Sequence, residues 1–153
     1  MTTTALAPTF PSPANDRTLP LRILLAEDNE TMLRLLGFVL RSDGHALAEA
    51  RDGTELLEAL ASSLLGEPAG RFDAIVAEQS LPGVEGLTIL AGLRARGLPT
   101  PFVLITADPD IQARAQRLGG VVLDQPFNTR AIRDAVTAAS EATTRTSRSP
   151  STS

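Results

Sequence analysis

The stretch FDAIVAEQSLPG, residues 72–83, decides how the rest of the sequence is read. Its first six residues form a short apolar run, which predicts a strand buried on both faces of a sheet. Glu78 follows at the carboxyl end of this strand, and Leu81-Pro82-Gly83 then forms a turn. In an open parallel α/β sheet, ligand sites lie beyond the carboxyl ends of the strands. Glu78 is therefore the first candidate for a functional residue.

Strands and helices alternate on both sides of this stretch. Short apolar runs predict strands at residues 21–26, 45–50, 72–77, 102–105 and 121–123. Helical spacing of apolar residues follows each run, and the helix starts carry capping residues, namely Asp28 or Asn29, Asp52 with Glu55, Asp108-Pro109 and Asn128. The order βαβαβαβαβα predicts an α/β fold with a parallel sheet and helices on both faces, because crossover connections are right-handed.

The composition excludes several classes of protein. A net charge of −4 and a pI of about 5.0 argue against a nucleic-acid-binding surface. With no Cys and a single His, His45, the chain has no disulfide, no thiolate chemistry and no zinc site built on Cys or clustered His. His45 is interpreted as a solvated turn residue. No apolar run approaches the roughly 20 residues of a membrane span, and no signal peptide is recognised, so we expect a cytoplasmic protein.

The chain is expected to hold one folded domain between two tails. Residues 1–20 are rich in Thr, Pro and Ala without periodicity, which predicts a disordered tail. Residues 21–139 carry the alternating pattern and form the domain. Residues 140–153 are rich in Ser, Thr and Arg and predict a second disordered tail.

Two further carboxylates, Glu27 and Asp28, directly follow the first expected strand. Since the carboxyl ends of neighbouring parallel strands lie at one edge of the sheet, we expect Glu27, Asp28 and Glu78 to meet there. Clustered carboxylates raise one another's pKa or require a counter-ion. All 14 basic residues are Arg, so no Lys of this chain supplies a compact ammonium at that point.

Taken together in order, these motifs resemble the receiver domain of bacterial response regulators. They are the acidic pair after the first strand, an acid followed by Leu-Pro-Gly after the third, Ile-Thr-Ala after the fourth and Gln-Pro-Phe after the fifth. The resemblance runs from Arg22 to about Ala139. It implies a flavodoxin-like, doubly wound five-stranded parallel sheet of strand order 2-1-3-4-5.

The resemblance also implies roles for individual residues. Glu78 takes the position of the phosphoacceptor Asp, and Glu27, Asp28 and the backbone carbonyl of Ser80 take the positions that hold Mg²⁺ with it. Thr106, Val122 and Gln125 take the positions of the switch hydroxyl, the switch aromatic residue and the Lys. Pro82 and Gly83 shape the turn after the third strand, and the peptide bond before Pro126 matches one that is usually cis in the family.

Three of these positions depart from the family pattern. Glu78 is one methylene longer than Asp, and Gln125 donates hydrogen bonds but carries no charge. Val122 has no ring to change rotamer. Phosphoryl transfer depends on positioning and charge stabilisation, so these changes are expected to weaken it. We expect weak divalent-metal affinity, or a shared proton in its place.

The sequence therefore predicts an atypical, stand-alone receiver domain in two-component signalling, not an enzyme and not switched by Asp phosphorylation. It would act as a protein–protein interaction module, with a sensor kinase or a downstream protein docking on the face at about residues 108–139. Glu78 could hold one conformation through contact with Thr106. Two alternatives stay open: a regulator that accepts phosphate at Glu78 or a neighbour, and a small nucleotide-binding or enzymatic flavodoxin-like protein. The second is disfavoured because no Gly-rich loop follows the first strand.

Overall fold

The computed structural model describes residues 20–66 and 70–148, with side chains placed as far as residue 142. The predicted N-terminal tail lies outside the described residues, apart from Pro20, and so do residues 149–153 of the predicted C-terminal tail.

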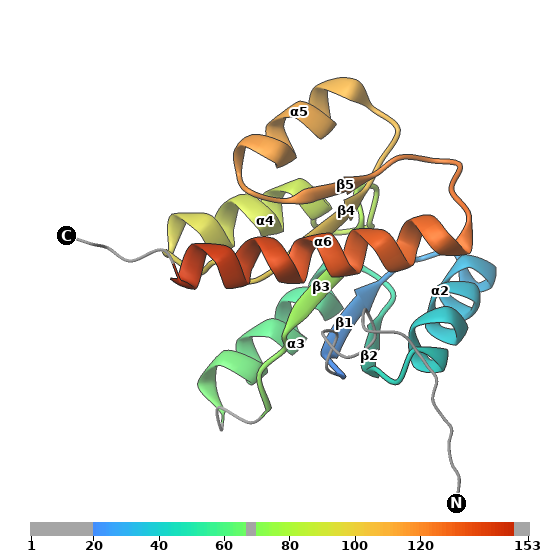
Figure 1. Ribbon diagram of the computed structural model, residues 1–153, viewed down its shortest axis with the longest axis horizontal. Coiled ribbons are helices and arrows are strands. Elements are labelled where there is room, and N and C mark those ends of the chain that lie inside the picture. The colour runs from blue at the N-terminus through green and yellow to red at the C-terminus, as the bar shows by residue number, and fades with distance from the viewer. Residues whose placement is uncertain (1–19, 67–69, 149–153) are drawn as a thin grey trace, which may run out of the picture.

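Five parallel strands form one sheet, in the order β2-β1-β3-β4-β5 (Figure 1). The strands are β1 (Arg22–Ala26), β2 (Ala46–Ala50), β3 (Ala74–Glu78), β4 (Phe102–Ile105) and β5 (Val121–Leu123). This order confirms the predicted flavodoxin-like topology. The apolar runs form strands because a central parallel strand is buried on both faces, and the three central strands β1, β3 and β4 are almost completely buried.

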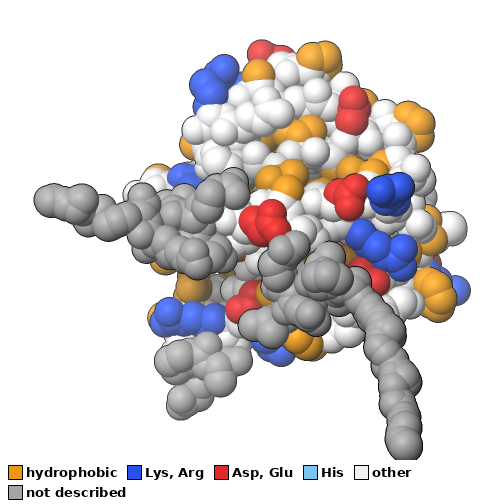
Figure 2. Space-filling view, viewed as in Figure 1, with side chains coloured by type: hydrophobic (Ala, Val, Ile, Leu, Met, Phe, Trp, Pro, Cys, Tyr) orange, Lys and Arg blue, Asp and Glu red, His pale blue; other side chains and the backbone are white. Residues whose placement is uncertain are grey.

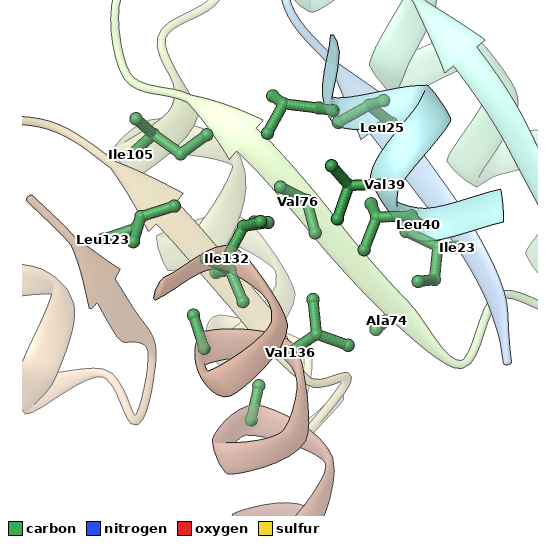
Figure 3. Close-up of a cluster of buried hydrophobic side chains, with 14 of the residues drawn as sticks. Ile23, Leu25, Val39, Leu40, Ala74, Val76, Ile105, Leu123, Ile132 and Val136 are labelled. Atoms are coloured by element: carbon green, nitrogen blue, oxygen red, sulfur yellow. The ribbon is translucent and has the colours of Figure 1, made fainter. Parts of the chain in front are cut away.

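The helices are α2 (Glu30–Ser42), α3 (Gly53–Leu65), α4 (Gly86–Ala95), α5 (Pro109–Arg117) and α6 (Thr129–Arg148). Residues of α2 and α6 share one buried cluster with one face of the sheet, whereas α3, α4 and α5 share the other cluster with the opposite face. Figure 3 shows the first cluster, in which Ile132 and Val136 of α6 lie beside Val76, and Val39 and Leu40 of α2 lie near Ile23. Helices thus cover both faces of the sheet, and the loops that follow the strands surround its carboxyl edge.

Polar side chains cap the helices as the sequence predicts. Met32 N–H donates to Oδ1 of Asn29 (2.8 Å), and Glu55 N–H donates to Oδ1 of Asp52 (2.7 Å). Asp108 and Asn128 accept equivalent bonds at the starts of α5 and α6. Each bond satisfies a backbone N–H that has no partner within the helix.

The end of α6 corrects the predicted domain boundary. We expected this helix to end near Ala139 and a disordered tail to follow, but α6 continues to Arg148. Composition alone misled the prediction, because extending an existing helix adds a hydrogen bond per residue and needs no buried face. No Gly or Pro interrupts the sequence until Pro150.

The prediction of a solvated His45 was wrong. Only 7% of His45 is exposed, and its Nδ1 accepts a hydrogen bond from the backbone N–H of Leu21 at 3.0 Å. The imidazole joins the turn before β2 to the residue that precedes β1. Burial lowers the pKa of His45, an effect that the nearby carboxylate of Asp43 opposes.

Arg94 connects two loops at the amino edge of the sheet. Its guanidinium donates to the carbonyls of Leu118 (2.6 Å), Leu98 (2.7 Å) and Thr100 (2.9 Å). The end of α5 is thereby fastened to the connection between α4 and β4. Burial lowers the pKa of Arg94, and the five-donor geometry of a guanidinium suits this divergent set of acceptors.

Candidate functional site

The strand register brings the predicted acids to one edge of the sheet. Ala26 of β1 pairs with Ala77 of β3, so Glu27 and Glu78, the next residue of each strand, lie side by side. Glu78 in turn pairs with Ile105 of β4, which places Thr106 one residue beyond it. The structure therefore brings Glu27, Glu78 and Thr106 together at the carboxyl ends of β1, β3 and β4.

Glu27 is the most buried of the three acids, with 3% of the residue exposed. Its Oε2 accepts a hydrogen bond from Asn29 N–H at 3.1 Å, whereas its Oε1 is buried without a partner among the described residues. Burial raises the pKa of Glu27 from 4.5 to about 7, and the charges of Glu78 and Asp28 add to this effect. Asp28 itself is exposed at the rim.

Glu78 is half-buried at the end of β3 and is held by two donors. Nε2 of Gln125 donates to its Oε1 at 3.2 Å, and Ser80 N–H lies 3.5 Å from its Oε2. Burial raises the pKa of Glu78, and these donors oppose the rise because they favour the charged form. Gln125 thus occupies the position where the resemblance places a Lys, but it contributes a hydrogen bond without a charge.

Thr106 does not make the contact with Glu78 that we hypothesised. Its hydroxyl accepts a hydrogen bond from Asp108 N–H at 3.2 Å, and its carbonyl accepts one from Nε2 of Gln112 at 2.8 Å. The side chain is buried and takes part in the start of α5. Because Asp108, the N-cap of α5, lies only two residues further on, the nearest free N–H group belongs to the helix start.

The loop after β3 is fixed by its neighbours. Gly53 N–H donates to the carbonyl of Pro82 at 2.8 Å, and Gly83 has a φ of +90°, a conformation that favours glycine. No sequence pattern pointed to Gln79, which is buried next to Glu78. Its Oε1 accepts from Leu87 N–H at 2.7 Å and so supplies the cap that Glu85 does not provide for α4.

The chain is similar to known proteins in both sequence and fold. A family model described as the response regulator receiver domain matches residues 23–137. The chain belongs to this family. The receiver domain is 32% identical over 123 residues to the chemotaxis protein CheY of Pseudomonas aeruginosa PAO1, covering 76% of this chain and 93% of that protein.

The other matches agree. The receiver domain is 33% identical over 129 residues to the transcriptional regulatory protein TcrA of Mycobacterium tuberculosis H37Rv, covering 82% of this chain and 48% of TcrA. The chain thus spans about half the length of that relative. Among solved structures, a signal receiver domain from an HD domain-containing protein of Pseudomonas fluorescens Pf-5 matches with a TM-score of 0.69 and 28% identity, covering 87% of this chain and 96% of that one. CheY4 of Vibrio cholerae matches in fold, with a TM-score of 0.66 and 21% identity, covering 78% of this chain and 98% of that one.

The remaining predicted positions lie at the β5 end of the receiver domain. Val122 is partly buried and packs in the cluster beneath α3, α4 and α5. The peptide bond between Gln125 and Pro126 is cis, as the resemblance implies. This cis bond lies in the loop that brings Gln125 to Glu78.

Magnesium, which the family implies, fits these residues only in part. The donors are oxygens, the type of ligand that Mg²⁺ prefers, and Oε1 of Glu27 has no other partner. Within residues 20–66 and 70–148, however, no three Asp, Glu, His or Cys side chains are arranged closely enough to hold a metal ion. Both oxygens of Glu78 face hydrogen-bond donors instead. The site is therefore not a ready-made magnesium centre.

Within the same residues, no helix combines the length and apolar character needed to cross a bilayer.

Proposed function

We propose that this receiver domain acts in two-component signalling as a protein–protein interaction module that Asp phosphorylation does not regulate. The hydrogen bond between Gln125 and Glu78 carries the proposal, since it joins the positions of the phosphoacceptor and the Lys with neither residue present. Membership of the receiver family supports the signalling role, and the departures at these two positions support the loss of phosphoryl chemistry.

Two physical effects oppose phosphoryl transfer to Glu78. The extra methylene displaces the carboxylate by about one bond length, and a misplacement of about 1 Å can slow a reaction on the order of 100-fold. The amide of Gln125 does not neutralise charge that develops on a phosphoryl group, and the sequence contains no Lys to do so. We propose that Mg²⁺ binds weakly at Glu27, Asp28, Glu78 and the Ser80 carbonyl.

We further propose that a sensor kinase or a downstream signalling protein docks on the face at about residues 108–139. This face comprises α5, β5 and the first part of α6. Support comes from the way α5 is held at both ends, by Gln112 bound to the Thr106 carbonyl and by Arg94 bound to the Leu118 carbonyl. A face fixed in this way offers a partner one surface without a preceding switch.

Intact-mass measurement tests the proposal. The protein is incubated with acetyl phosphate and Mg²⁺, and separately with a phosphorylated sensor kinase, and we expect no gain in mass. Uptake of one phosphoryl group, mapped to Glu78 or a neighbour, would establish the alternative of a phosphorylated regulator. A receiver domain with Asp at the position of Glu78 serves as the positive control for the phosphodonor.

A further inference from the structure

Acidic side chains gather at the carboxyl edge of the sheet, defined here as Glu78 together with residues 27–29, 51–52, 79–85, 106–108 and 124–128. This edge contains one basic residue, Arg51. It contains seven carboxylates: Glu27, Asp28, Asp52, Glu78, Glu85, Asp108 and Asp124. On the face drawn in Figure 2, by contrast, acidic and basic side chains are interspersed. Seven carboxylates against one Arg give the carboxyl edge a formal charge of −6.

Within the described part of the chain, none of these seven carboxylates forms an ion pair. The ion pairs found among the described residues involve Glu30, Glu49, Asp43 and Asp134, and none involves the seven. Arg51 is engaged outside the group, by Glu30 at 3.2 Å. Asp52 and Asp108 cap the N-termini of α3 and α5, but a capping carboxylate keeps its charge.

The centre of the edge has an unfilled hydrogen-bonding position. Oε1 of Glu27 is buried and accepts no hydrogen bond from residues 20–66 or 70–142, and Glu27 as a whole is only 3% exposed. An unsatisfied buried oxygen of this kind destabilises the fold, and more so when it is charged. Asp28 and Glu78 lie close enough to raise the pKa of Glu27. A donor that approaches Glu27 therefore meets two further carboxylates, and a positively charged donor is favoured over a neutral one.

We propose that the carboxyl edge is a docking surface for a basic segment of a partner protein, with one Lys or Arg side chain taking the place of weakly bound Mg²⁺ among Glu27, Asp28 and Glu78. The inference rests on the proposed role as an interaction module and names the chemistry of the partner. Nucleic acid is the wrong occupant, because its phosphates would be repelled by seven carboxylates. A basic peptide has the complementary charge, and its side chain supplies the donor that Glu27 lacks.

Titration of the full chain with a short fluorescent peptide, with Lys at alternate positions, tests this inference. We expect binding that weakens as salt is added, because exposed charges are screened. Asp28→Asn and Glu78→Gln should each weaken binding about two- to fivefold, the range for single exposed charge contacts. Glu58→Gln removes the same charge from α3, away from the carboxyl edge, and should leave the affinity unchanged. Amide NMR signals should shift at residues 27–29 and 78–80.

Four outcomes would overturn the inference: no binding, equal binding of the Lys-acetylated peptide, an equal loss in Glu58→Gln, or shifts confined to residues 108–139. Asp28 is exposed and Asn has nearly the same size and shape, so Asp28→Asn tests the site rather than folding. Phosphoryl uptake in the mass experiment would contradict the proposed function whatever the peptide does. Failure of the peptide without phosphoryl uptake would contradict the docking site alone.

Discussion

Gln125 reaches past the end of β4 to donate a hydrogen bond to Glu78, which ends β3. The contact spans 3.2 Å between Nε2 and Oε1 and joins residues 47 positions apart in the sequence. It replaces a charge–charge contact with a charge–dipole contact at the centre of the site. Reversing both substitutions, at Glu78 and Gln125, should therefore restore a charge–charge contact.

The double variant Glu78→Asp, Gln125→Lys should gain phosphoryl uptake from acetyl phosphate in the presence of Mg²⁺. Asp withdraws the carboxylate by one methylene, and the ammonium neutralises charge on the phosphoryl group. Intact mass over a time course gives the rate, which should exceed that of the native chain at least about tenfold if the two positions limit the chemistry. Gln125→Arg with Glu78→Asp is the control, because Arg carries the charge in a different shape. If the double variant stays inert, other residues must block the reaction.

Glu27→Gln should stabilise the protein above neutral pH. Because the pKa of Glu27 rises from 4.5 to about 7 on folding, its contribution to stability is complete below pH 4.5 and is lost as the pH rises through about 7. The neutral amide avoids this loss. At pH 8 with a metal chelator, denaturant unfolding should give the variant an advantage of up to about 3 kcal/mol, at 1.36 kcal/mol per pKa unit.

The advantage of Glu27→Gln should shrink as the pH falls towards 5, where native Glu27 is protonated. Glu58→Gln, at an exposed position on α3, should show no such trend. A constant difference between native and Glu27→Gln across this range would mean that Glu27 is ionised throughout.

His45 should affect stability in the opposite direction. The folded-state pKa of His45 is lowered below 6.5, so its contribution is present above pH 6.5 and is lost as the pH falls through the folded value. Protonation would also remove the acceptor for Leu21 N–H. Since His45 is the only His, its imidazole NMR signal should give a single titration with a midpoint below 6.5.

His45→Asn offers a matched control, because its side-chain oxygen can accept a hydrogen bond but does not titrate. The stability difference between native and His45→Asn should fall between pH 7 and pH 5. An imidazole midpoint at or above 6.5 would contradict the buried, accepting role of the ring. Asp43, the nearby carboxylate, is itself bound by Arg133 at 3.0 Å.

Gly53→Ala should destabilise the fold and Gly92→Ala should not. A Cβ on Gly53 would clash with the carbonyl oxygen of Val84, a backbone atom, whereas a Cβ on Gly92 would meet nothing within 4 Å. We expect Gly53→Ala to cost more than about 2 kcal/mol, since the loop after β3 must move. Gly92 lies within α4, where Ala should gain about 0.5–1 kcal/mol. Thermal unfolding compares the two.

Local features of this protein could be predicted from the sequence. Asn29, Asp52, Asp108 and Asn128 cap their helices as expected, because capping depends on residues two or three positions apart. The meeting of Glu27 with Glu78 could be predicted as well. It requires only that both residues end neighbouring parallel strands.

Features that depend on distant or competing partners could not be predicted. The burial of His45 depends on Leu21, 24 residues away. We expected the Thr106 hydroxyl to contact Glu78, but it accepts a hydrogen bond from the N–H of Asp108 at the helix start instead. The unpaired oxygen of Glu27 and the buried Gln79 follow from the geometry of the loops, which has no sequence pattern of its own.

The guanidinium of Arg94 determines how α5 can open. Three carbonyls from two separate loops share this one side chain, and its bond to Leu118 ties the far end of α5 to the connection that follows α4. Amide hydrogens of α5 should therefore exchange with solvent in step with those near the end of α4, as one cooperative unit. Replacing Arg94 with Met would divide that unit in two, and the faster half would be the helix on which a partner is expected to dock.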